Sequence, residues 1–415
     1  MTENPSPSRH DSFLALRYKD FRYWIYLNFL LTFAFLIQEV IIGYELYRIT
    51  HDPMAIGIVG LAEAIPFILL SIFGGHFADK LSKKKLMLWM AVFTAFASTF
   101  LFFMSLRLLT SADVENLKYV IWAVIFFIGT CRAFYSPASG AMKAFLVPKE
   151  AYANSSAWSS SSWQTASIAG PGLSGFLYSI FGFSNTLLFV IGLIILSLFF
   201  LVRIKDRKIE PQTGSSMIKL IKEGFLYTYK TKIIFYSISL DMFSVMFGGV
   251  IAILPIFAQD ILKVGPEALG ILRMTPSVGA VLVLLFLAKH PPMKHAWRTL
   301  LLTVAGFGIA TLVFAVSKNF YLSAAALFLT GSFDSISVVI RNTILQLMVP
   351  DNMRGRVNAI NGIFLSTSNE VGAFESGLAA KLMGTVPSVI FGGAMTLIVT
   401  AYIYFRSKEL FKMKF

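Results

Sequence analysis

Several charged side chains lie inside long apolar stretches of the chain, where an unpaired charge is costly. Glu375, five residues from Glu370 and facing a different way, is one candidate proton carrier. The candidates for a central site are five carboxylates and one guanidinium: Glu39, Glu63, Asp241, Asp334, Glu370 and Arg132. A carboxylate can take up and release a proton, so each of the five could carry one through an apolar environment. An arginine keeps its charge and would tune a nearby carboxylate through its field. The alternative is that some of these groups serve packing or gating, bonded to Ser, Thr, Asn or Tyr neighbours.

Arg132 and Asp334 occupy equivalent places in an internal repeat. The same shift along the sequence that relates Arg132 to Asp334 also relates Gly129 to Gly331. Arg132 lies near the middle of its apolar stretch, so it needs a charged partner or water. We therefore expect Arg132 and Asp334 to face a central cavity, with a purely structural ion pair as the alternative.

The composition excludes several classes of protein. Of the 415 residues, 56% are hydrophobic and 14% are charged, whereas a soluble domain has about 25% charged residues. This excludes a soluble enzyme, a secreted disulfide-rich domain and a disordered chain. Cys131 is the single cysteine, so no disulfide within the chain and no cysteine-based metal site can form. The histidines show no metal-ligand spacing and no Walker sequence is present, so we expect neither a cofactor nor enzymatic activity.

Twelve apolar stretches are long enough to cross a membrane as helices of about 20 residues. They cover residues 22–46, 54–78, 85–107, 119–146, 153–181, 184–203, 232–259, 266–288, 298–317, 320–348, 356–380 and 387–405. Most of the 36 Lys and Arg residues fall on the face that carries both termini, which places both termini in the cytoplasm. The net charge is +14, but the basic residues cluster in the short loops of this face. Nucleic acid is therefore not expected as a partner.

The longest loop, 204–231, lies at the midpoint of the chain and separates two six-helix halves, 1–203 and 232–415. Within it, residues 217–229 have the pattern of an amphipathic surface helix. Matching glycines and Val-Pro pairs in the two halves indicate a duplication, as in major facilitator transporters. The sequence thus predicts an all-α polytopic membrane protein with twelve transmembrane helices in two bundles joined by a cytoplasmic linker.

The loop after the second stretch resembles a signature of major facilitator transporters. It runs from Gly75 to Asp79 and Lys80, followed by a basic cluster. Gly75 would let helices pack closely, and Asp79 would sit against the positive N-terminus of the helix that opens near Arg354 and Arg356. That contact would latch the two halves in an outward-facing state. The alternative is an ordinary basic loop on the cytoplasmic face.

The fifth stretch contains Gly170-Pro171, which is similar to a signature of proton-driven antiporters in this superfamily. Glycine and proline remove side-chain bulk and a backbone hydrogen bond, so the helix bends and packs tightly. The signature favours export over import. The alternative is an ordinary kinked packing helix.

Three stretches resemble the enterobactin-exporter-like branch of the superfamily: 241–258, 264–273 and 349–378. Together with Val147-Pro148 and Asn154, the resemblance covers nearly the whole chain. Members of this branch export catecholate siderophores, and relatives of the branch are drug exporters. The resemblance implies proton-coupled export of a small organic solute across a bacterial inner membrane by alternating access.

The expected partners are therefore a small organic substrate, protons and the lipid bilayer, with the chain acting as a monomer. A siderophore or another amphipathic molecule is the expected cargo. Three alternatives remain open at this point: a broad-range multidrug efflux pump, a proton-coupled importer, and a membrane sensor or membrane enzyme that transports nothing.

Overall fold

The computed structural model describes residues 11–109, 113–143, 145–206, 217–290, 292 and 295–412, and in these residues it is helical with no strands. Helices and short turns make up the whole described chain, which confirms the predicted all-α class. Nine helices among the described residues are long and apolar enough to cross a membrane by length and composition. The chain is therefore a multi-pass membrane protein.

The first half contains five long helices. They are α1 (Lys19–Thr50), α2 (Pro53–Lys80), α3 (Lys83–Leu108), α4 (Leu117–Lys143) and α5 (Tyr152–Arg203). Helix α5 covers two predicted spans, because its helical geometry is interrupted only at Gly182, whose φ is 73°. That left-handed conformation suits glycine, and it falls in the short gap predicted between the fifth and sixth spans.

The linker contains helix α6 (Met217–Lys230). The second half then consists of α7 (Lys232–Gly248), α8 (Leu254–Ile256), a π-helical turn (Phe257–Ile261), α9 (Pro266–Leu287), α10 (Ala296–Val316), α11 (Phe320–Met348), α12 (Asp351–Met383) and α13 (Thr385–Arg406). Helix α12 begins at Asp351, about one turn before the predicted start of this helix near Arg354. Gly384, with φ at 93°, ends α12 and leads into α13.

The predicted span 232–259 is wrong as a single helix, because the chain leaves the helical conformation after Gly248. Residues 249–253 have no regular helix, and helical structure resumes at α8 and the π-helical turn. Broken backbone at membrane depth must find other partners for its polar groups. One is found here, because Arg273 Nη1 donates to the carbonyl oxygen of Ile251 at 2.7 Å.

The nine apolar helices differ from the predicted twelve spans for physical reasons. Helix α5 counts once although it covers two spans, α7 has 17 residues, and α12 carries several charged and amide side chains. The count of twelve therefore stays a prediction.

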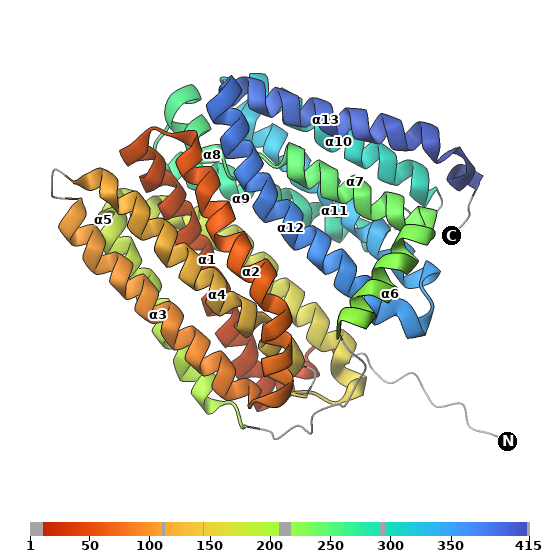
Figure 1. Ribbon diagram of the computed structural model, residues 1–415, viewed down its shortest axis with the longest axis horizontal. Helices are drawn as coiled ribbons and strands as arrows, with labels where there is room; N and C mark the ends of the chain where they lie inside the picture. Colours follow the sequence, from red (N-terminus) through yellow and green to blue (C-terminus); the bar gives the residue numbers. More distant parts are fainter. Residues whose placement is uncertain are drawn as a thin grey trace.

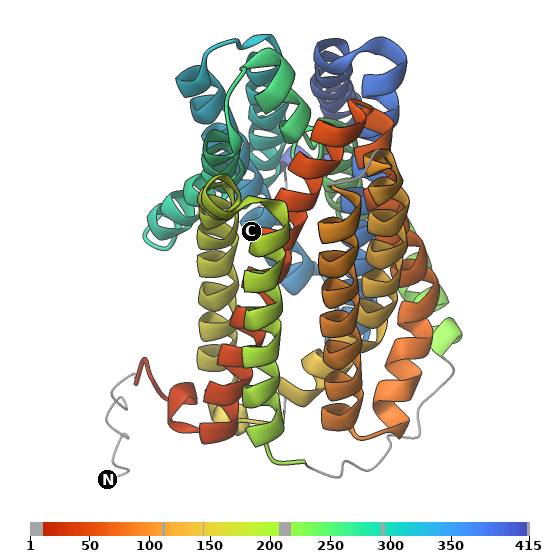
Figure 2. The ribbon, with the colours of Figure 1, turned by 90° about the vertical axis from the view of Figure 1, so that its left-hand side faces the viewer.

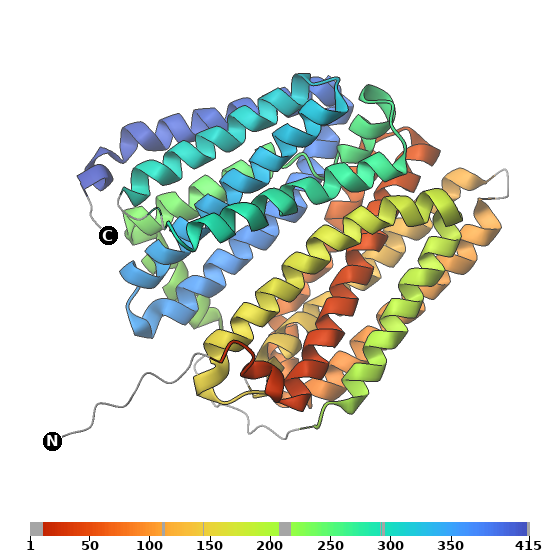
Figure 3. The same cartoon turned by 180° about the vertical axis from the view of Figure 1, so that it is seen from behind.

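Figure 1 and Figure 3 show the helices of the first half lying beside those of the second, with the two sets diverging toward the end that carries both termini. In Figure 2 the first half faces the viewer, with its helices seen from the side and α1 crossing between its neighbours. Helices α2 and α12 form one contact between the halves, and α5 and α9 form another. We name the end where the halves meet, around residues 47–57 and 260–270, the closed end.

The apolar core follows the same arrangement. One cluster of buried residues comes entirely from residues 15–204, and a second comes entirely from 233–410. A third joins Val40, Tyr47 and Ile56 of the first half to residues 250–389 of the second. The halves thus each have a core of their own and share apolar packing at the closed end.

Close helix packing depends on glycine. A Cβ at Gly392 of α13 would lie 3.0 Å from the carbonyl carbon of Phe247 in α7, closer than side-chain carbons normally approach. A Cβ at Gly192 of α5 would meet nothing within 4 Å. Small residues at such contacts let membrane helices approach each other directly.

Gly392→Ala is expected to lower the free energy of unfolding by about 2 kcal/mol, because the added methyl group overpacks the α7–α13 contact. Gly192→Ala is the matched control and should leave the stability unchanged. Thermal unfolding of the two purified variants in the same detergent measures the difference. Equal melting temperatures would contradict the packing assignment.

Candidate functional site

Each of three arginines inside the helical bundle forms an ion pair with its own carboxylate. The pairs are Arg132–Glu63 between α4 and α2, Arg273–Glu39 between α9 and α1, and Arg341–Asp241 between α11 and α7. Pairing is what an apolar surrounding demands of a permanent charge. Two of these pairs lie within one half, whereas Arg273–Glu39 joins the two halves.

The Arg341–Asp241 pair is the most deeply buried of the three. The side chain of Arg341 is 2% exposed and that of Asp241 is 6% exposed. Arg341 was not among the residues predicted to form the site, although it lies in an apolar stretch like the others. The signal that could have found it is the same one that selected Arg132, an arginine in the middle of a membrane span.

Two carboxylates are left over from this pairing. Among the described residues, neither Asp334 nor Glu370 has a hydrogen bond or an ion pair. Asp334 lies in the field of Asp241 and Arg341, and Glu370 lies in the field of Arg132 and Glu39. They are therefore the two groups of this region whose negative charge has no direct partner.

Both unpaired carboxylates line one cavity of about 290 Å³. Its wall includes the broken segment after α7 and parts of α9, α10, α11 and α12, and it is lined by Glu39, Val245, Gly248, Gly249, Val250, Ile251, Ala252, Pro276, Phe307, Thr330, Gly331, Asp334, Asn369, Glu370, Gly372 and Ala373. Glu39 is the one lining residue from the first half. Among the residues that the structure describes, no Lys, Arg or His lines this cavity, so its charged side chains are all acidic.

Four of the six predicted site residues are thereby brought together. Glu39, Asp334 and Glu370 line the cavity, and Asp241 lines a smaller one that shares Asp334 as part of its wall. Arg132 and Glu63 line neither cavity; they pair with each other, and the Arg132 guanidinium lies 5.7 Å from the ring centre of Phe67. Arg132 and Asp334 are therefore equivalent in the repeat but are not bonded to each other.

The predicted gating residues do not share a single contact in the structure. Gly170 is buried against α1, where an added Cβ would lie 3.0 Å from the Cβ of Leu36. The carbonyl oxygen of Pro171 lies 2.7 Å from where a Cβ of Gly270 would stand, so this segment of α5 packs directly on α9 of the other half. The Gly-Pro segment thus lies at a contact between the halves.

The cytoplasmic signature is only partly described. The side chain of Asp79 lies outside the described residues, so its latch contact stays a prediction. Gly75 is partly buried and Lys80 is exposed. Gly74, which precedes Gly75, makes a close contact, since an added Cβ there would lie 2.9 Å from the carbonyl carbon of Ala133 in α4.

The two predicted arginines at the start of α12 contact different partners. Arg354 donates to the carbonyl oxygen of Gln346 at 3.2 Å. Arg356 forms an ion pair with Glu223 of the linker helix α6. The predicted linker helix is thus tied to α12 of the second half.

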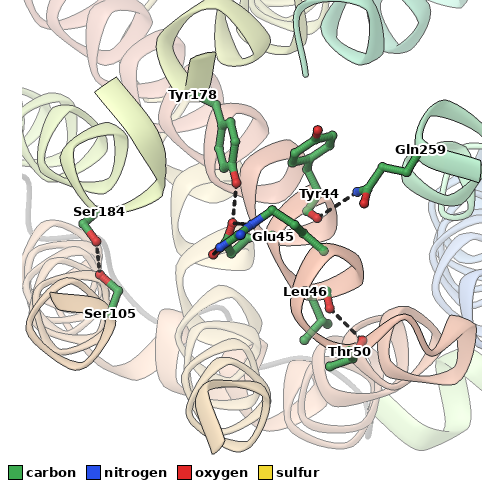
Figure 4. Close-up of polar contacts among 9 residues, drawn as sticks. Tyr44, Glu45, Leu46, Thr50, Ser105, Tyr178, Ser184 and Gln259 are labelled. Atoms are coloured by element: carbon green, nitrogen blue, oxygen red, sulfur yellow. Dashed lines mark hydrogen bonds and ion pairs between the residues drawn. The ribbon is translucent and has the colours of Figure 1, made fainter. Parts of the chain in front are cut away.

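A polar cluster at the closed end was not predicted. Glu45 is fully buried, forms a bidentate pair with Arg48 at 2.7 and 2.9 Å, and accepts a hydrogen bond from the hydroxyl of Tyr178. Figure 4 shows Tyr178 pointing at Glu45 beside Tyr44. The signal was an acid and a base three residues apart at the end of an apolar stretch.

Further polar contacts join the two halves at the closed end. Gln259 donates to the carbonyl oxygen of Tyr44 at 3.1 Å, and Lys381 forms an ion pair with Asp52 at 3.0 Å. The hydroxyl of Tyr47 donates to Asp260. These contacts and the Arg273–Glu39 pair hold the two halves together at the closed end.

Solved structures with the same arrangement of helices define the class of protein. A D-xylose–proton symporter matches with a TM-score of 0.70 at 14% identity, covering 96% of this chain and 100% of that one. A bacterial homologue of the iron transporter ferroportin matches with a TM-score of 0.71 at 16% identity, covering 96% of this chain and 99% of that one. The chain therefore has the fold of the major facilitator transporters, as predicted.

The family follows from the sequence. The family described as Transmembrane secretion effector matches residues 10–414, so the chain belongs to that family.

Three curated proteins are similar over most of the chain. A staphyloferrin A transporter of Staphylococcus aureus is 23% identical over 94% of this chain and 96% of its own length. Macrolide efflux protein A of Streptococcus pyogenes is 21% identical over 88% and 90%. An Na+, Li+, K+/H+ antiporter of Planococcus maritimus is 21% identical over 72% and 75%.

These findings confirm the predicted resemblance to the exporter-like branch of the superfamily. The protein is a secondary transporter of small molecules and not an enzyme.

Arg341→Met is expected to lower the free energy of unfolding by about 3–5 kcal/mol, because it leaves the buried Asp241 without its partner. Adding Asp241→Asn should restore much of the loss, since the uncompensated charge is then removed. Lys232→Met is the matched control: it breaks the Lys232–Glu409 pair, whose side chains are 63% and 57% exposed, and should have little effect. Thermal unfolding in detergent measures all three; an equal loss in Arg341→Met and Lys232→Met would refute the buried pair.

Proposed function

We propose that the protein exports a small amphipathic organic solute in exchange for protons. The observation that carries this proposal is the pair of leftover carboxylates, Asp334 and Glu370, on the wall of one cavity. A carboxylate without a fixed partner can be neutralised either by a proton or by cargo. Competition between the two at one site couples their movements.

The proposed motion is alternating access between the halves 1–203 and 232–415, with 204–231 as the cytoplasmic linker. Both termini are proposed to lie in the cytoplasm of a bacterium, at the inner membrane, because the basic loops share their face. The halves touch at the closed end and diverge toward the termini (Figure 1), so the described state corresponds to an inward-facing one. Cargo would then enter the cavity from the cytoplasm, and one chain would suffice for the cycle.

The proposed exchange proceeds at the two carboxylates. In the inward-facing state the carboxylates release protons to the cytoplasm, and cargo takes their place. Rocking of the halves breaks the contacts of the closed end, including Arg273–Glu39, and exposes the cavity to the outside. Protons from outside then neutralise the carboxylates and the cargo leaves.

The relatives support export by exchange. One relative is named an efflux protein and another an antiporter that exchanges cations for protons. The position of Gly170-Pro171 at a contact between the halves agrees with the antiporter-like signature. A broad-range multidrug pump is the second candidate, favoured by the efflux relative, and competition by unrelated lipophilic compounds would identify it. Proton-coupled import would show as the opposite direction of flux in inside-out vesicles.

Glu370→Gln and Asp334→Asn are each expected to reduce solute transport driven by a pH gradient at least about tenfold, because the amide cannot exchange a proton. Glu375→Gln is the matched control, since Glu375 lies on the same helix, turns to a different side and does not line the cavity. The measurement is uptake into proteoliposomes of a panel of siderophores and drugs under an imposed pH gradient, with expression and folding verified.

Solute counterflow without a gradient, measured at saturating solute, should fall less than gradient-driven transport in the two cavity variants, because it needs binding and rocking but no net proton movement. Arg132→Ala belongs in the same series, since Arg132 acts on Glu370 through its field. Full gradient-driven activity in both Arg132→Ala and Asp334→Asn would refute the proposed cavity roles, and loss in Glu375→Gln would show that the effect is not confined to the cavity.

A further inference from the structure

We propose that the cargo is an organic cation: a small molecule with an apolar body and a basic amine or a quaternary ammonium group. This inference rests on the proposed function, because it names the substrate class of the same cavity. It differs from the siderophore-like cargo implied by the sequence resemblance.

The first step is the charge of the cavity wall. Three carboxylates line it, from Glu39, Asp334 and Glu370, and no basic side chain does. Arg273 does not line the cavity, but it forms an ion pair with Glu39 and also donates a hydrogen bond to the carbonyl oxygen of Ile251. Two negative charges therefore remain, and an uncompensated buried charge is strongly unfavourable.

The second step is that no nearby arginine is free to compensate them. Arg132 is paired with Glu63, and Arg341 is paired with Asp241. The three ion pairs and the cavity wall together hold five carboxylates and three arginines: Glu39, Glu63, Asp241, Asp334 and Glu370 against Arg132, Arg273 and Arg341. Among the described residues no arginine is thus left to compensate Asp334 and Glu370, and protons or cargo can supply the positive charge.

The third step is the shape and chemistry of the remaining wall. Apolar surface comes from Val245, Val250, Ile251, Pro276 and Phe307. The cavity of about 290 Å³ is at the lower end of the size that pockets for organic ligands usually have, roughly 300–1,000 Å³. Phe307 adds an aromatic ring, which attracts cations as well as apolar groups. A small cation with an apolar body satisfies all of these surfaces together.

The sign of the charge on the cargo also decides whether the cargo is exchanged for protons or travels together with them. A cation binds the ionised carboxylates, so it displaces protons and is exchanged for them. An anion could bind only beside protonated Asp334 and Glu370, so it would travel together with protons. Exchange with protons and an acidic wall are therefore mutually consistent only for a cationic cargo.

The experiment compares probes of similar shape and opposite charge on the purified full-length protein in detergent. Phenyltrimethylammonium and benzenesulfonate both carry a tetrahedral head on a phenyl ring, with charges of opposite sign. Isothermal titration calorimetry at several pH values is expected to show binding of the ammonium probe, tightening as the pH rises by up to about tenfold per unit for each displaced proton. Glu370→Gln and Asp334→Asn should weaken that binding and flatten its pH dependence, whereas Glu375→Gln should not.

Tighter binding of benzenesulfonate, or binding of neither probe at millimolar concentration, would overturn the cationic assignment. The proposed function fails separately. If the ammonium probe binds in this way but moves no protons in proteoliposomes, the cation site stands and proton antiport does not. If a pH gradient drives a neutral or anionic solute through Asp334 and Glu370, proton coupling stands and the cationic assignment does not.

Discussion

An ionised side chain inside a membrane needs a partner of opposite charge, and this requirement organises the interior of the protein. Three arginines hold three carboxylates, and each pair fixes two helices against each other: α2 with α4, α7 with α11, and α1 with α9. The first two pairs lie within one half and can persist through a rocking motion. In the proposed rocking motion, the Arg273–Glu39 pair and the more exposed Lys381–Asp52 pair would have to open when the halves separate at the closed end.

Arg273 connects this ion pair to the break in α7. Its guanidinium binds the carboxylate of Glu39 and also donates to the carbonyl oxygen of Ile251, in the segment where the helix is broken. The broken segment forms part of the cavity wall. In the proposed cycle, opening the closed end would therefore disturb a contact between the halves and a wall of the cavity at the same time. Arg273 is the side chain through which occupancy of the cavity would then act on the relative position of the halves.

Apolar periodicity predicted most helices, because a membrane span must be long and apolar whatever it packs against. The break in α7 escaped prediction because the apolar run continues through 249–256, and hydropathy does not distinguish a broken segment from a helix. Charge pairing escaped it because the partner depends on how each helix is rotated in the bundle. The predicted repeat relates Arg132 to Asp334, yet Arg132 pairs with Glu63 of α2, whereas Asp334 is left unpaired on the cavity wall. A match of positions in the sequence therefore did not predict the partners of these two side chains.

The ion pairs are distributed differently in the two halves. In the first half Arg132 and Glu63 neutralise each other, whereas the partner of Glu39 is Arg273 of the second half. In the second half Arg341 pairs with Asp241, while Asp334 and Glu370 have no such partner on the cavity wall. The linker helix α6 is tied to this same half through Arg356 and Glu223. If the halves rock as proposed, separating Glu39 from Arg273 adds a third carboxylate without a partner to a wall that already holds two, so binding of a proton or a cation before the movement would lower its electrostatic cost.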